Sequence, residues 1–263
     1  MSDSPSAKSP KIIAIANQKG GVGKTTTTIN LGAALSEIGH RVLLVDLDPQ
    51  GNASTGLGVD QRDHTTYDLL LENMPLGDVM QPSRIERVWI TPATTDLSSA
   101  DMAMAAHGRR AHLLHDALRQ AEMDGFGFDY VLIDCPPSLN LLTINAMVAA
   151  DSVLVPLQCE FFALEGLSQL ILTIREVRES ANPKLRMEGV LLTMYDARNN
   201  LTLQVEQDAR NTLGDMVFST VIPRNVRLSE APSFALSVLE YDTHSRGSEA
   251  YRAFAQELSG KNH

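Results

Sequence analysis

Short runs of apolar, often β-branched residues alternate along the chain with longer segments whose apolar positions recur every three to four residues. The short runs predict strands at residues 12–16, 41–46, 88–91, 130–134, 152–157, 189–194 and 217–222. The longer segments predict helices at residues 25–38, 66–72, 98–106, 110–122, 140–149, 164–180, 201–213 and 248–258. Strands that alternate with helices are typical of an α/β fold. We therefore predict a mostly parallel, twisted sheet with helices on both faces.

No linker divides this alternation, so we expect a single domain over residues 11–263. The most apolar stretch, residues 130–157, is interrupted by Asp, Asn and Pro and does not predict a membrane span. Residues 1–10 are small and polar and lack the apolar core of a signal peptide. We expect them to form a flexible tail on a cytoplasmic protein.

A glycine-rich segment joins the first predicted strand to the first predicted helix, reading Lys-Gly-Gly-Val-Gly-Lys-Thr-Thr from Lys19 to Thr26. Glycines allow a tight turn whose N–H groups face anionic oxygens, and the start of the helix adds partial positive charge. We therefore predict a P-loop NTPase, in which Lys24 reaches the β- and γ-phosphates and Thr25 ligates Mg²⁺. The ordinary motif has glycine where this chain has Gln18, and Lys19 is an additional lysine. Because Lys19 enters the loop so early, we expect its ammonium to reach the phosphates of a facing subunit.

Acidic residues end two of the predicted strands. Asp46 and Asp48 follow the second strand, where one carboxylate can orient or deprotonate the attacking water and the other can support the Mg²⁺ waters or the loop. The alternative for this segment is ordinary turn chemistry, since Asp, Pro, Gln, Gly and Asn all favour turns. Asp134 ends the apolar run 130–133, a Walker B pattern that delivers a carboxylate to Mg²⁺. We expect the two prolines that follow to begin a switch loop that senses the γ-phosphate.

The composition changes this picture little. The chain is 43% hydrophobic and 21% charged, as soluble globular proteins are, and its formal net charge is −10. That charge opposes nucleic-acid binding, so any contact with DNA requires a local basic patch. Cys135 and Cys159 are too few for a disulfide framework, and we expect buried thiols rather than a cluster shared between subunits. His112 and His115 lack any further ligand pattern, which favours a solvated helix face.

Four segments resemble the short chromosomal ParA (Soj) branch of the ParA/MinD family of P-loop ATPases with a deviant Walker A motif. They are residues 16–26, 45–52, 163–166 and 221–232, and the resemblance extends from Lys11 to Leu258. In that family two subunits sandwich two ATP molecules, the dimer binds DNA without sequence preference, and a ParB-type partner stimulates hydrolysis. The resemblance therefore implies a Mg²⁺-dependent ATPase that forms a homodimer on the nucleoid and drives chromosome or plasmid segregation.

The resemblance also implies a role for individual residues. The catalytic residues would be Lys19, Lys24 and Asp48, with Lys19 crossing the interface and Asp48 positioning the water. The nucleotide site would comprise Lys19, Gly20, Gly21, Val22, Gly23, Lys24, Thr25, Thr26, Pro223 and Asn225, and the magnesium site Thr25, Asp48 and Asp134. The DNA contacts would be Arg198, Arg224 and Arg227. Without the resemblance, the expected role of these arginines would be a surface ion pair or, for Arg224, a structural contact near the nucleotide.

The chain departs from the family at Ala235-Leu236-Ser237, where many relatives have Gly, then Lys or Leu, then Pro. A lysine that would add to the DNA surface is absent there, which predicts a DNA affinity that is weaker or differently placed. One alternative function is a MinD-like membrane-cycling regulator, but residues 251–263 have too little apolar face and basic charge for a stable membrane anchor. A second alternative, a ParA-like ATPase that positions a protein cargo, stays open.

Overall fold

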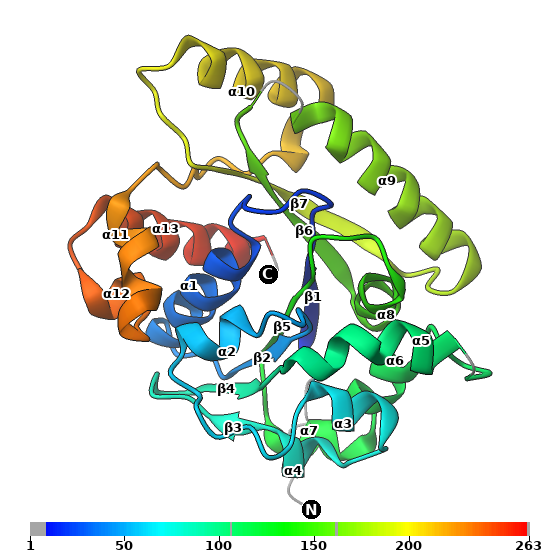
Figure 1. Ribbon diagram of the computed structural model, residues 1–263. Coiled ribbons are helices and arrows are strands. Elements are labelled where there is room, and N and C mark those ends of the chain that lie inside the picture. The colour runs from blue at the N-terminus through cyan, green and yellow to red at the C-terminus, as the bar shows by residue number, and fades with distance from the viewer. Residues whose placement is uncertain (1–8, 106, 161–162, 262–263) are drawn as a thin grey trace, which may run out of the picture.

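The computed structural model describes residues 9–105, 107–160 and 163–261. Its centre is a seven-stranded sheet with strand order β3-β4-β2-β5-β1-β6-β7 (Figure 1). The strands are β1 (Lys11–Ile15), β2 (Val42–Asp46), β3 (Gln81–Pro82), β4 (Val88–Thr91), β5 (Tyr130–Asp134), β6 (Ser152–Gln158) and β7 (Arg186–Thr193). All neighbouring pairs are parallel except β3 and β4, which are antiparallel. The predicted mostly parallel sheet is confirmed.

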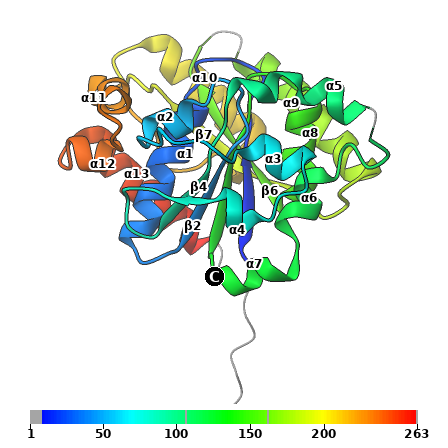
Figure 2. The same ribbon diagram turned by 60° about the horizontal axis from the view of Figure 1, so that its bottom comes forward.

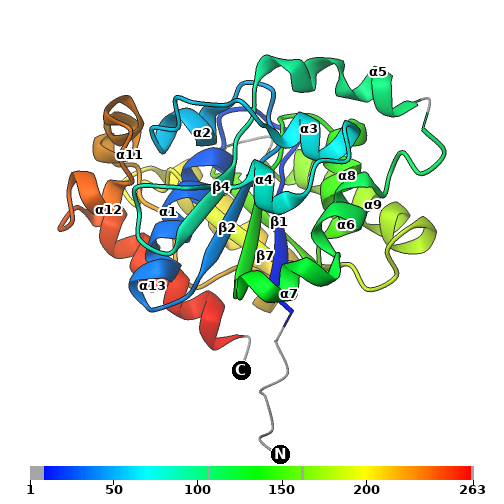
Figure 3. The same ribbon diagram turned by 90° about the horizontal axis from the view of Figure 1, so that it is seen from below.

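Helices cover both faces of the sheet, as Figure 3 shows from below. Along β1, Ile13 and Ile15 point into one apolar core, and Ile12 and Ala14 point into the other. Because both faces are buried, the central strands read as continuous apolar runs rather than as alternating ones. The first core is covered by α1 (Lys24–Glu37), α12 (Val238–Tyr241) and α13 (Arg246–Gly260), and the second mainly by α6 (Leu113–Leu118), α8 (Leu141–Ala149), α9 (Ala163–Ser180) and α10 (Asn200–Leu213).

Several short helices lie in the connections (Figure 2). They are α2 (Asn52–Gly56), α3 (Thr66–Leu71), α4 (Leu76–Val79), α5 (Ala100–Ala105), α7 (Ala121–Phe126) and α11 (Val226–Glu230), with 3₁₀ turns η1 (Thr95–Ser99), η2 (Gly214–Met216) and η3 (Ala231–Phe234). The sequence predicted α3 but not α2, α4, α11 or α12. The predicted helix 98–106 begins as η1 and continues as α5, and Ala106 lies outside the described residues.

The prediction of one helix over residues 110–122 is wrong. Helix α6 ends at Leu118 and α7 begins only at Ala121. Between them, Gln120 has extended backbone angles (φ −72°, ψ 151°), so the helical hydrogen-bond ladder cannot continue through it. At this break, Arg119 turns to Asp151 at the start of β6, with 2.6 Å between Nη2 and Oδ1. A long-range ion pair therefore coincides with the point at which the local helical pattern stops.

The prediction of a seventh strand at residues 217–222 is also wrong. This segment runs beside β7 but forms only isolated parallel bridges, at Val217 and at Pro223. The backbone N–H groups of Ser219 and Thr220 donate instead to the carboxylate of Glu257 on α13, at 2.7 and 2.8 Å. Since a strand ladder needs its N–H groups for the neighbouring strand, the carboxylate interrupts the ladder.

Other expectations concern the tail, the thiols and the membrane. Residues 1–8 of the predicted tail lie outside the described residues, whereas Ser9 donates to Asp124 at 3.2 Å. Cys135 and Cys159 are both buried, as predicted. Burial raises the pKa of the Cys159 thiol to about 12. In the described part of the chain, none of the helices combines the length and apolarity needed to cross a membrane.

Candidate nucleotide site and basic surface

The glycine-rich segment forms a loop between the carboxyl end of β1 and the start of α1. Gly21 and Gly23 have positive φ angles of 74° and 90°, which side chains with a Cβ atom rarely adopt. Gly23 is the N-cap of α1 and provides no side-chain cap, so the first N–H groups of the helix face the loop. From β7, the Thr193 hydroxyl donates to the Val22 carbonyl at 2.9 Å and fixes the top of the loop. The loop therefore has the form of a phosphate cradle.

The two lysines of the loop point in different directions. Lys24 is buried, and its ammonium donates to the Lys19 carbonyl at 3.1 Å, inside the loop. The Lys19 side chain is half exposed and forms an ion pair with Glu160, which follows β6 in the same chain. The expectation that this ammonium stays free for a facing subunit is therefore modified, because an intramolecular carboxylate holds it here. The backbone N–H of Lys19 donates to Asn17 Oδ1 at 3.0 Å, which fixes the entrance of the loop.

Three carboxylates gather beside the loop. Asp46 and Asp134 end the neighbouring strands β2 and β5 and are partners in the strand register, and Asp48 is also buried. Asp46 accepts hydrogen bonds from the Ser54 N–H at 2.8 Å and from the Ser54 hydroxyl at 2.6 Å, so it anchors α2. Asp48 Oδ1 accepts from the Gln50 N–H at 3.0 Å. The division of roles predicted for Asp46 and Asp48 thus favours Asp46 as the support of the loop.

Burial dominates the electrostatics of these carboxylates. It raises the pKa of Asp46 to about 6, against the hydrogen bonds from Ser54. The pKa of Asp134 is raised well above its usual value, first by burial and then by the charge of Asp46, whereas the Thr25 hydroxyl and Lys24 lower it. Burial also lowers the pKa of Lys24, and the charges of Asp134 and Asp48 oppose that effect. A cation beside Asp134 would relieve the repulsion between the buried carboxylates.

The donor set at this point suits magnesium. Among the described atoms, Asp134 Oδ2 is buried without any hydrogen-bond partner, while Oδ1 accepts from the Thr28 hydroxyl at 3.4 Å. The Thr25 hydroxyl also acts on this carboxyl group. Mg²⁺ is usually bound by one or two protein oxygens, with phosphate oxygens and water completing its shell. Of the three predicted ligands, Thr25 lies beside Asp134, whose Oδ2 has no hydrogen-bond partner among the described atoms. Asp48 lies in the same cluster.

A cavity of about 350 Å³ adjoins the loop. Gly23 and Thr26 line it together with Pro223 and Asn225, which come from the other end of the chain. The structure therefore brings together two distant groups of predicted nucleotide-binding residues. The volume lies within the range of small-ligand pockets. Asn225 is partly committed already, because its side-chain oxygen caps α11 by accepting from the Arg227 N–H at 2.9 Å.

The three arginines predicted to contact DNA differ in their pairing. Arg198 is 91% exposed and pairs with Asp196 at 2.9 Å. Arg227 pairs with Glu230 at 2.8 Å and with Asp242 at 3.3 Å. Arg198 and Arg224 line one groove, whereas Arg227 lies on α11.

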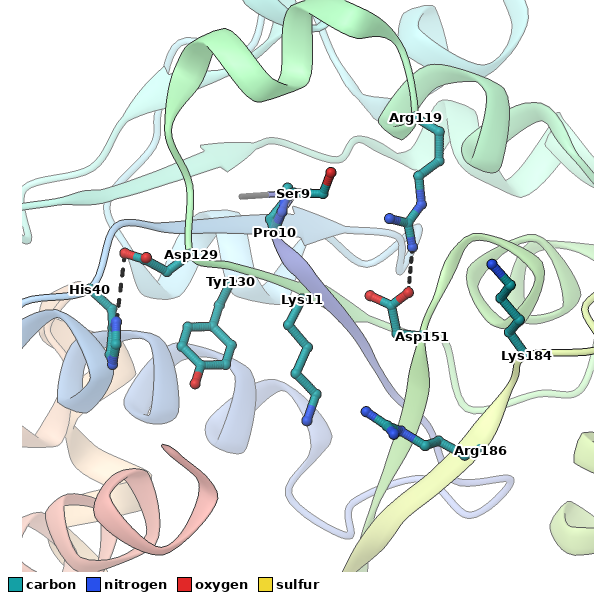
Figure 4. A pocket seen from close by; sticks show the side chains of 10 residues that line it. All are labelled: Ser9, Pro10, Lys11, His40, Arg119, Asp129, Tyr130, Asp151, Lys184 and Arg186. Atoms are coloured by element: carbon teal, nitrogen blue, oxygen red, sulfur yellow. Dashed lines mark hydrogen bonds and ion pairs between the residues drawn. The ribbon is translucent and has the colours of Figure 1, made fainter. Parts of the chain in front are cut away.

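A second cavity, of about 460 Å³, lies at the opposite end of the strands, where β1 and β7 begin (Figure 4). Its charges are largely paired, with Arg119 on Asp151 at 2.6 Å and His40 near Asp129 at 3.6 Å. Ligands of parallel α/β sheets bind at the carboxyl ends of the strands, whereas this cavity lies at the amino ends. We therefore do not assign it to the nucleotide.

Several residues of the site could not have been identified from the local sequence. Glu160 meets Lys19 across 141 positions, Thr193 meets Val22 across 171, and Tyr251 lies 3.2 Å from the Thr27 hydroxyl across 224. None of them belongs to a pattern that indicates nucleotide chemistry by itself. Only the fold brings them to the loop.

Comparison with known proteins agrees with this geometry. Residues 10–187 match a protein family described as an AAA domain. The chain is 55% identical over 255 residues to the chromosome partitioning protein ParA of Caulobacter vibrioides, which covers 96% of this chain and 95% of that protein. It is 51% identical to the sporulation initiation inhibitor protein Soj of Bacillus subtilis, with coverage of 95% and 98%.

A solved structure with the same fold contains a nucleotide. Cobyrinic acid a,c-diamide synthase from Mycobacterium smegmatis, with bound ADP and magnesium, matches with a TM-score of 0.81 and 39% identity, over 94% of this chain and 93% of that one. The sequence identity to the partitioning proteins is higher and extends over nearly the full length of both chains, not over the loop alone. The chain therefore belongs to the ParA/Soj family of chromosome-partitioning ATPases.

Proposed function

We propose that this protein is an ATP-driven dimerising switch that binds DNA non-specifically and hydrolyses ATP under stimulation by a ParB-type partner, to segregate a chromosome or plasmid. One observation carries the proposal. Lys24 already fills the interior of the loop, whereas Lys19 points outward to Glu160 on the surface. Once that ion pair opens, Lys19 is available to the phosphates of a second subunit rather than to its own. Two subunits would then close around two nucleotides.

The residues beside the loop would divide the chemistry of hydrolysis. Thr25 and Asp134 would hold Mg²⁺, which neutralises charge on the phosphates, with Asp48 within the same acidic cluster. Asp48 would position the attacking water, and Lys24 would stabilise negative charge as the γ-phosphate departs. The backbone of Gly20, Gly21, Val22 and Gly23 would bind the phosphates, together with Thr26 at the start of α1. A donor supplied by a partner protein would add to this constellation, as the proposed stimulation requires.

The proposed dimer acts on the nucleoid rather than on a membrane. The apolar residues Tyr251, Phe254 and Leu258 of the last helix are buried against α1 and the sheet. They are therefore not available to insert into a lipid surface, which supports the proposal that the chain lacks a stable membrane anchor. Basic residues at the surface, including Arg198, would instead meet DNA phosphates.

Retention on DNA tests the proposal directly. Binding to duplex DNA of arbitrary sequence is measured at several salt concentrations with ATP, with ADP and without nucleotide. We expect retention only with ATP, and a steep loss of affinity as salt rises. Equal retention in all three nucleotide states would contradict the switch.

Three variants assign the steps. Lys24→Ala should lose ATP binding or turnover, because it removes the cation within the loop. Asp48→Ala should accumulate an ATP-bound dimer, because hydrolysis stops after assembly. Arg227→Glu should lose DNA while it retains dimerisation, and wild-type DNA affinity in that variant would show that the basic surface is wrongly assigned.

A further inference from the structure

A groove of about 660 Å³ beside the nucleotide pocket brings three arginines together from three separate parts of the chain. Arg198 comes from the loop after β7, Arg224 from the segment that runs beside β7, and Arg246 from the start of α13. Asp196 and Glu249 also line the groove, so its lining carries three positive and two negative charges. A locally positive groove is notable in a chain of net charge −10.

The three arginines are not equally available to a ligand. Arg198 lies in a bidentate pair with Asp196, with Nε–Oδ1 and Nη2–Oδ2 distances both of 2.9 Å. This pairing holds the pKa of Asp196 at about 2, and Arg224 contributes to the same effect. Arg224 and Arg246 are both exposed, and neither forms an ion pair with a carboxylate in the part of the chain that the structure describes. Their guanidinium groups therefore retain their donors for another molecule.

Within the described residues, no side-chain hydrogen bond or ion pair ties Arg246 to the rest of the fold. Arg246 is the first residue of a fifteen-residue helix, where the helix dipole disfavours a cation. The cap of the helix is supplied by another residue, since the Ser245 hydroxyl accepts from the Ser248 N–H at 3.2 Å. A side chain that opposes the local electrostatics without a compensating contact is expected at functional sites.

We propose that Arg224 and Arg246 form the principal phosphate-binding pair of the DNA surface, and that Asp196 competes with DNA for Arg198. This inference rests on the proposed function and deepens it. Phosphate contacts of this kind give affinity without sequence information. Exposed guanidinium groups from separate elements suit the regularly spaced phosphates of a duplex, and their charge suits its high density of negative charge. The last helix thereby becomes part of the DNA surface.

Salt dependence of DNA binding tests the role of Arg246. The protein is loaded with a slowly hydrolysed ATP analogue, and its affinity for a random-sequence duplex is measured between about 50 and 200 mM salt. Each lost phosphate contact lowers the slope of log K against log salt by about 0.9, so Arg246→Ala should lower it by about 1.8 for a dimer. Arg246→Lys should keep most of the slope, because it keeps the charge. Arg178→Ala, which removes an exposed arginine from the last turn of α9, is the matched control and should keep the wild-type slope.

Asp196→Asn tests the competition. It frees Arg198 from its carboxylate and should therefore raise DNA affinity at low salt and steepen the slope of log K against log salt by about 0.9 for each protomer. An unchanged slope in Arg246→Ala, or lower affinity in Asp196→Asn, would overturn the inference while wild-type binding still supports the switch. Absence of wild-type binding with the ATP analogue at every salt concentration would overturn the proposed function and this inference together.

Discussion

The ion pair between Lys19 and Glu160 should act as a brake on dimerisation. In the single chain it holds the ammonium that the proposed mechanism needs at the other subunit's phosphates. Closure of the dimer must break one such pair in each protomer. Glu160→Gln removes the carboxylate charge with little change of shape, so it should favour the ATP-bound dimer. The direction of this change in dimer stability is informative, because a mutation that only damaged the site would weaken the dimer.

The exposure of the pair sets the size of the effect. The two side chains are 50% and 44% exposed, so solvent screens the attraction strongly. Ion pairs of this kind contribute about 0.2–1 kcal/mol each, and two pairs contribute about 0.4–2 kcal/mol to the dimerisation equilibrium. At about 1.4 kcal/mol for each factor of ten, Glu160→Gln should tighten the dimer dissociation constant by about 2- to 30-fold. Since salt screens the pair further, the gain should shrink as ionic strength rises.

Sedimentation of the protein with a slowly hydrolysed ATP analogue measures this constant. Glu165→Gln serves as the control, because Glu165 is exposed in the first turn of α9. The substitution removes the same charge a few positions away from Glu160. It should leave the constant unchanged. A dimer equally stable in Glu160→Gln and wild type at low salt, or a weaker one, would refute the reasoning that the pair opposes assembly.

Two further predictions concern stability. Burial raises the pKa of Asp46 from 3.8 to about 6, so the stability linked to its proton is fully present below pH 3.8 and is lost as pH rises through 6. Without Mg²⁺ and nucleotide, the unfolding free energy of wild type relative to Asp46→Asn should fall by about 2.4 kcal/mol between pH 4 and 7 in denaturant titrations, whereas a pH-independent difference would contradict this. Ala235 has a left-handed backbone (φ 54°), so Ala235→Gly should raise the unfolding free energy by about 0.5 kcal/mol, and thermal unfolding should show a rise of about 1–2 °C. Ala253→Gly, in the exposed face of α13, should lower the unfolding free energy by about 1 kcal/mol, and the same sign in both glycine variants would contradict the strain at Ala235.

The departure at residues 235–237 shows how the structure resolves a question that the sequence posed. Ala235 adopts the left-handed conformation that glycine prefers, so the turn keeps this shape at a cost in strain. Ser237 then caps α12, forming a capping box with Glu240. A sequence comparison can identify the missing glycine, but only the backbone angles show that the turn tolerates its loss.

Periodic patterns predicted the fold well where local and long-range forces agree. The buried strands β1, β2, β5 and β6 are apolar runs that no competing partner disturbs, and six of the seven predicted strands are present. The failures occurred where a distant side chain decides the backbone. Glu257 accepts hydrogen bonds from two N–H groups of the predicted seventh strand, and no local pattern could reveal a carboxylate some forty positions away.

The candidate site divides in the same way. The glycine loop and the acidic residues lie at strand ends, so the sequence alone could place them together. Their pattern predicted that the loop, Asp48 and Asp134 meet at the carboxyl ends of the strands. The pairing of the charged surface residues could not be predicted from the sequence pattern. Whether Lys19 or Arg198 is free or paired depends on carboxylates that only the folded chain brings within reach.

These pairs bear on how the proposed DNA binding would be limited to one nucleotide state in a chain of net charge −10. In the single chain, Arg198 and Arg227 are paired with their own carboxylates, so the proposed DNA surface of one subunit offers mainly Arg224 and Arg246 to a polyanion. The logarithm of the affinity scales with the number of phosphate contacts. Joining two such surfaces doubles that number, so it doubles the logarithm of the affinity rather than the affinity itself. The proposed dimer would therefore bind DNA firmly under conditions in which each half scarcely binds, without any rearrangement of the basic surface of the subunit. On this argument, control of DNA binding requires only control of dimerisation, which the nucleotide and Lys19 would supply.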